Sequence, residues 1–144
     1  MSLISFNYAD VKTISLKKKE IIKEVVAEIF SSEGKTLEVL RYIFCSDDYL
    51  LKINKTFLNH DFLTDVISFD LSNGKATIGE VYISVDRVKE NAILHSAAFP
   101  KELSRVIFHA ALHLCDYKDK KKSEITIMRG KEDYYLQLLK KKLC

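Results

Sequence analysis

Residues 108–119 read FHAALHLCDYKD, and this stretch is the most informative structural signal in the chain. His109 and His113 stand four residues apart, a spacing that puts both imidazole rings on one face of a helix. The apolar residues around them are Val106, Ile107, Leu112 and Leu114. Pro100 suits the first turn of a helix, where its missing N–H is no loss. We therefore expect a buried helix from Pro100 to about Cys115, with a histidine pair on one face.

Apolar residues on both sides of this helix follow the periods of strands and of further helices. The expected strands cover residues 3–8, 36–45, 64–69 and 78–85. The expected helices cover residues 16–30, 47–56, 86–95, 100–115 and 124–143. This mixture predicts an α+β fold, a single domain over residues 1–144 with a small mixed β-sheet covered by helices. Local signals of this kind do not predict the order of the strands.

The composition is that of an ordinary soluble domain, with 47% hydrophobic and 30% charged residues. The sequence contains no run of 18 apolar residues, so we expect no membrane-spanning segment. The N-terminal residues lack the pattern of a signal peptide. Cys45, Cys115 and Cys144 are an odd number without a CxxC pair, which favours a reducing compartment. Together these features predict a cytoplasmic protein, and they leave its oligomeric state open.

Lysine is concentrated in three runs, although the net charge of the chain is only +3. The runs are 17–19, 120–122 and 140–142. Such a charge permits RNA as a partner without requiring it. Lys120, Lys121 and Lys122 are the RNA-binding candidates, because they directly follow the stretch quoted above. Each run is equally compatible with a solvated loop or helix end.

The histidine pair and the carboxylate that follows it predict a metal site. Two histidines alone are weak evidence for a metal, but Asp119 comes six residues after His113 and can return to the same face. Two histidines and one carboxylate form a known catalytic zinc set, which leaves a fourth coordination position for water. Ala110 stands where zinc peptidases of the HExxH type have their glutamate, which argues against that mechanism.

These residues resemble the YbeY family, whose metal motif is H-G-x-L-H-L-x-G-Y-D-H. The matching positions are His109, Leu112, His113, Leu114 and Tyr117. Asp119 stands at the third histidine of the family, and a carboxylate oxygen is an acceptable zinc ligand. The segment 54–69 resembles L-N-x-x-Y-R-x-x-D-x-x-T-D-V-L-S-F, and the segment 78–84 resembles L-G-D-I-x-I-S.

The resemblance implies a zinc-dependent, single-strand-specific endoribonuclease that acts in rRNA maturation and ribosome quality control. One zinc ion per chain, held by His109, His113 and Asp119, and RNA in ribosomal particles as partner are implied with it. The family's arginine in segment 54–69 is Leu58 here, so we assign no catalytic residue beyond a possible role for His60. Met128, like the family's later methionine, fits a place near the metal or an ordinary place in the core.

Two other functions remain compatible with these residues. The first is a metal-dependent hydrolase of another substrate, such as a peptide. Its general base would have to come from another position, because residue 110 is alanine. The second is a ribosome-associated binding protein whose metal is structural, which Leu58 in place of arginine would favour. An open coordination position argues for an enzyme, and a closed shell argues for a structural site.

Overall fold

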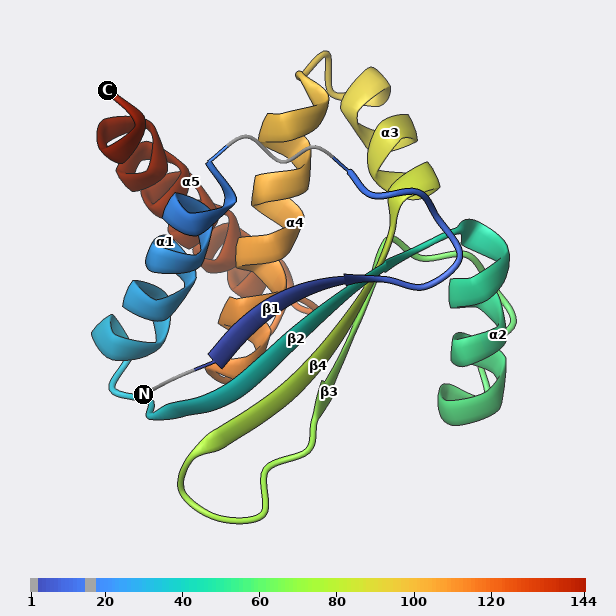
Figure 1. Ribbon diagram of the computed structural model, residues 1–144, viewed down its shortest axis with the longest axis horizontal. Helices are drawn as coiled ribbons and strands as arrows, with labels where there is room; N and C mark the ends of the chain where they lie inside the picture. Colours follow the sequence, from blue (N-terminus) through green and yellow to red (C-terminus); the bar gives the residue numbers. More distant parts are fainter. Residues whose placement is uncertain (1–2, 15–17) are drawn as a thin grey trace.

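The computed structural model describes residues 3–14 and 18–144. Its strands are β1 (Leu3–Tyr8), β2 (Leu37–Cys45), β3 (Val66–Asp70) and β4 (Thr77–Ser84). Its helices are α1 (Lys19–Ser32), α2 (Asp47–Leu58), α3 (Val85–Leu94), α4 (Phe99–Leu114) and α5 (Lys122–Leu143). The α+β class and the single small sheet predicted from the sequence are confirmed (Figure 1).

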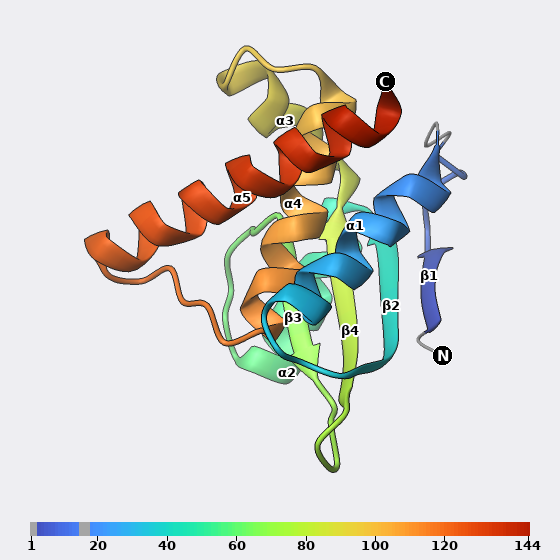
Figure 2. The same cartoon turned by 90° about the vertical axis from the view of Figure 1, so that its left-hand side faces the viewer.

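The sheet is mixed, with the strand order β1-β2-β4-β3. β1 and β4 both pair with β2 in parallel, whereas β3 pairs with β4 antiparallel. The antiparallel pair is possible with a short connection, because strands that run in opposite directions need no crossover helix. α1, α4 and α5 pack together on one face of the sheet, and α2 covers part of the other (Figures 1 and 2).

Alternation along β4 divides its side chains between the two faces. Val81 and Ile83 belong to the main core beneath α1, α4 and α5. Tyr82, between them, packs against the smaller cluster, which includes Leu50 of α2 and Ile67 of β3. This division follows from the two-residue period of a strand. The burial of β4 follows this division, because Thr77, Gly79, Val81 and Ile83 are buried and the residues between them are half-buried.

The element boundaries differ from the predicted ones by a few residues. α2 extends to Leu58, so this residue ends a helix and does not begin the following loop. Asn59 then stops the helix in the left-handed conformation, with a φ of 55°. The predicted start of the first helix at Leu16, together with Lys17, lies outside the described residues. None of the described helices has the length and apolar character needed to span a bilayer.

Candidate metal centre

α4 passes through the middle of the helical layer and positions both histidines. Leu103, Ile107 and Leu112 are fully buried against the core, so the helix cannot rotate without exposing them. His109 and His113 share the remaining, partly exposed face, with ring centroids 4.6 Å apart and ring planes at 82°. Their side chains keep 21% and 30% of their surface exposed. The predicted helix and its histidine face are confirmed.

A tight turn after α4 returns the chain to these histidines. Asp116 adopts a φ of 74°, and the Tyr117 amide donates to the carbonyl of Leu112. Asp116 itself points away from the histidines and forms an ion pair with Lys35, at 2.6 Å. The reversal brings Asp119 beside the two rings.

The three predicted ligands converge on one point. Oδ2 of Asp119 lies 3.3 Å from Nε2 of His109 and 3.2 Å from Nε2 of His113. All three ligand atoms lie within 4.8 Å of one another. A tetrahedral zinc ion with bonds of about 2.0–2.1 Å separates its ligand atoms by about 3.3 Å. The two measured distances match this spacing, so the donor set fits a zinc-like ion. Three protein ligands are the number found in catalytic zinc sites.

Glu132 on α5 contacts His109 through the ring nitrogen that does not face Asp119. Its Oε2 atom lies 2.6 Å from Nδ1 of His109, and its Oε1 atom accepts from Arg105 at 2.9 Å. Burial opposes the charge on Glu132, but the bonds from His109 and Arg105 outweigh it and lower its pKa. Burial of the His109 ring is likewise outweighed, mainly by Glu132, so the pKa of His109 is raised. With Nδ1 engaged by Glu132, Nε2 is the atom of His109 that faces Asp119.

Asp65 is a further acidic group near the histidines. It precedes β3, and the Asn91 side-chain amide donates to its carboxylate at 3.2 Å. Burial raises the pKa of Asp65, and the positive charge of His109 partly offsets this effect. Asp65 lies in the segment 54–69 that resembles the family pattern, and the packing of α4 on β3 places it close to His109.

The remaining predicted residues are distributed around this centre. Lys120, Lys121 and Lys122 are exposed; the first two connect Asp119 to α5, and Lys122 is its first residue. His60 is exposed and stacks on Phe62, with ring centroids 5.0 Å apart. A role for either group in binding or catalysis stays a prediction.

Two residues named in the sequence analysis have structural surroundings that explain them. Met128 is 2% exposed and belongs to the main core. Ala110 is also fully buried on the side of α4 that faces away from solvent. A glutamate at position 110 would therefore meet the core, and the residue present there has no side-chain base to offer.

The fold and the site define a class: a small α+β domain with a His-His-Asp site of the kind found in metal-dependent hydrolases. The profile of the family described as Endoribonuclease YbeY matches residues 4–140. The chain belongs to this family.

Individual relatives support the assignment over nearly the whole chain. Endoribonuclease YbeY of Flavobacterium psychrophilum is 46% identical, with 94% of this chain and 96% of the relative covered. The protein of the same name from Karelsulcia muelleri is 49% identical, with 79% and 81% covered. The solution structure of TM1509 from Thermotoga maritima superimposes with a TM-score of 0.62 at 27% identity, covering 94% of this chain and 88% of that one.

Proposed function

We propose that this chain is a zinc-dependent endoribonuclease that cleaves single-stranded RNA in rRNA maturation and ribosome quality control, in the cytoplasm. The observation that carries the proposal is the convergence of His109, His113 and Asp119 at spacings that suit one zinc ion. The endoribonuclease name of the relatives supplies the substrate class. Ribosomal particles are the expected partner on the same ground.

Each group of residues at the site would have a separate role in catalysis. A zinc ion bound here would polarise a phosphoryl oxygen and lower the pKa of water. Glu132 fixes the orientation of His109, and Arg105 in turn fixes Glu132. Such outer partners of a metal ligand set its ring orientation and its basicity. Lys120, Lys121 and Lys122 lie next to Asp119 in the chain, where they would attract the phosphate backbone.

A peptidase is the weaker alternative, because position 110 holds a buried alanine in place of a general base. A purely structural metal is also disfavoured. The described residues bring three ligand groups together at this point, whereas structural zinc sites are closed by four.

The decisive experiment measures RNA cleavage as a function of metal. The purified protein is stripped with a chelator, reloaded with zinc or with manganese, and incubated with an end-labelled single-stranded RNA and with its duplex. We expect cleavage of the single strand by the loaded protein and none by the stripped protein. Asp119→Ala is the matched inactive variant. Full cleavage after metal removal, or activity on a peptide substrate alone, would contradict the proposal.

A further inference from the structure

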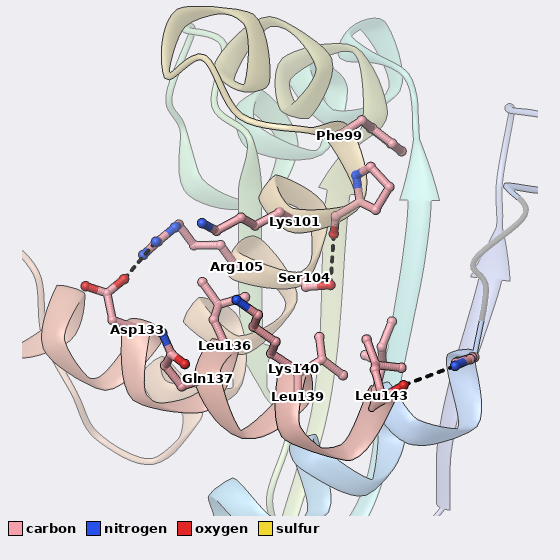
Figure 3. Close-up of a pocket in the computed structure, with 13 residues that line it drawn as sticks. Phe99, Lys101, Ser104, Arg105, Asp133, Leu136, Gln137, Leu139, Lys140 and Leu143 are labelled. Atoms are coloured by element: carbon pink, nitrogen blue, oxygen red, sulfur yellow. Dashed lines mark hydrogen bonds and ion pairs between the residues drawn. The ribbon is translucent and has the colours of Figure 1, made fainter.

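A hollow of about 900 Å³ opens between the N-terminal end of α4, the C-terminal half of α5 and the start of α1 (Figure 3). Its floor is aliphatic with a single aromatic ring. The floor residues are Ile22, Phe99, Pro100, Leu136, Leu139 and Leu143. The volume lies in the range of ligand sites, which are usually concave and mostly apolar.

Cationic side chains from α4, from α5 and from the N-cap of α1 surround this apolar floor. Among the residues that the structure describes, Lys18, Lys101, Arg105 and Lys140 line the hollow together with one carboxylate, Asp133, which gives these five residues a net charge of +3. The whole chain has the same net charge of +3. The charges of the remaining residues sum to zero, so this lining is more positive than the average of the chain, which favours an anionic occupant.

The shape of the floor suits one face of a helix. Leu136, Leu139 and Leu143 follow one another along α5, and the first and last stand seven residues apart, about 10.5 Å along the axis. A docked amphipathic helix presents anchors at i, i+4 and i+7 over the same length. Single-stranded RNA prefers stacked aromatic rings, and Phe99 is the one ring in this lining. A second copy of this chain would bring two cationic rims together.

Arg105 connects this hollow to the metal centre. One nitrogen of its guanidinium donates to Asp133 at 2.8 Å, and the other donates to Glu132 at 2.9 Å. Glu132 also holds Nδ1 of His109 at 2.6 Å. An anion that reaches Arg105 from the hollow competes with the carboxylate that orients the metal ligand.

We propose that the hollow is the docking site for a short acidic amphipathic helix of a partner protein, and that its occupancy weakens metal binding through Arg105. The docking half stands on the shape and charge of the hollow alone. The coupling half rests on the proposed function, because it requires that His109 bind the metal.

The docking half is tested with a designed peptide and metal-free protein. The probe is a fluorescein-labelled helix of about 15 residues with leucines at i, i+4 and i+7 and glutamate and alanine elsewhere. A second probe has lysine at each glutamate. We expect the acidic probe to bind, and Lys101→Glu/Lys140→Glu to weaken it at least about tenfold while gaining affinity for the basic probe. Lys52→Glu/Lys75→Glu, at exposed positions outside the hollow, is the charge-matched control.

The contrary outcomes are distinct. Equal anisotropy changes for the acidic probe with the parent and with the Lys101→Glu/Lys140→Glu variant would overturn the docking site, as would no preference for the acidic probe over the basic one. Displacement of the bound probe by a single-stranded oligonucleotide or by anionic vesicles would assign the hollow to that competitor instead. Self-association of the parent that the double variant abolishes would assign it to a second copy.

The coupling half is tested by zinc titration with and without the acidic probe. We expect the probe to lower zinc affinity about fivefold, and zinc to lower probe affinity by the same factor, because such linkage is reciprocal. Arg105→Lys keeps the charge but loses the two-pronged geometry. This variant should still bind the probe, but its zinc affinity should be the same with the probe as without the probe. Unchanged zinc affinity in the parent would overturn the coupling. Absence of zinc binding altogether would overturn the proposed function and the coupling together, while the probe titration still decides the docking site.

Discussion

Nδ1 of His109 lies 2.6 Å from Oε2 of Glu132, although the two residues stand 23 positions apart on different helices. The contact fixes the plane of the imidazole ring and leaves Nε2 as the nitrogen directed at Asp119. The Glu132 side chain is only 5% exposed, so water does not easily replace this contact. The candidate metal centre therefore depends on α5 as well as on α4.

The first prediction removes this contact. Glu132→Ala should lower zinc affinity about 10- to 100-fold, because loss of an outer partner frees the ligand ring and reduces its basicity. Glu132→Gln should have a smaller effect, since its amide oxygen still accepts from Nδ1. Asp133→Asn is the control, because it removes the charge of the other partner of Arg105 without touching His109. Zinc competition titrations decide the matter, and parental affinity in Glu132→Ala would show that the contact is not needed.

The second prediction concerns the third ligand. Asp119→Ala should weaken zinc binding strongly, since only two protein ligands remain, whereas Asp119→His should retain it because histidine is itself a good zinc ligand. Asp116→Asn is the matched control, because that carboxylate is paired with Lys35 on the other side of the turn and asparagine tolerates the left-handed backbone there. Titration of all three variants with zinc is the measurement. Tight binding by Asp119→Ala would exclude Asp119 as a ligand.

Asp119 and Glu132 show which parts of the site could be predicted from the sequence. Asp119 was predictable because it stands near His113 in the chain and a short turn can return it. Glu132 was not given a role, because its contact with His109 depends on the packing of α5 against α4, which is a non-local relationship. The parallel pairing of β2 with both β1 and β4 is likewise non-local. Strands and helices themselves were predictable because their apolar periods are local properties.

The third prediction tests how closely α4 packs on the sheet. A Cβ atom at Gly79 in β4 would lie 2.7 Å from Cδ1 of Leu114, the neighbour of His113. Gly79→Ala should therefore destabilise the fold by about 1–3 kcal/mol through overpacking. Gly130→Ala is the control, because nothing lies within 4 Å of its Cβ position on α5, and it should stabilise by about 0.5–1 kcal/mol. Urea unfolding measures the stability of both variants. A midpoint for Gly79→Ala equal to that of the parent would show that Leu114 moves aside freely.

The fourth prediction concerns acid stability. Burial of Glu33 opposes its ionisation, but hydrogen bonds from Tyr117, Lys131 and Tyr135 outweigh it and lower its pKa below the usual 4.5. The unfolded chain therefore binds this proton first as the pH falls. The stabilisation is complete above about pH 4.5 and is lost as the pH falls through the lower, folded-state value.

Glu33→Gln should accordingly lower the free energy of unfolding at neutral pH, and its deficit against the parent should shrink in acid. Denaturant titrations of both proteins across this pH range are the measurement. Glu24→Gln, at an exposed position of α1, the helix that Glu33 follows as its C-cap, is the matched control. A deficit that is the same at every pH would mean that the Glu33 contacts do not depend on its charge.

The last prediction concerns the lysine run that follows Asp119. If RNA reaches the metal centre, Lys120, Lys121 and Lys122 lie on its path, because they are exposed and adjoin a ligand. Each phosphate contact with single-stranded RNA contributes about −0.7 to the slope of log affinity against log salt. Replacing all three lysines with serine should therefore weaken binding similarly across sequences and flatten the slope by up to about 2.

Zinc affinity should stay nearly parental in this triple variant, since a protonated lysine offers no lone pair to a metal. The charge-matched control replaces Lys52, Lys55 and Lys75, which are exposed elsewhere on the fold, with serine. It should leave the salt slope close to that of the parent. A solvated loop without a binding role gives the opposite result: the slope would be the same in the parent and in the 120–122 variant. That outcome would remove residues 120–122 from the RNA-binding surface.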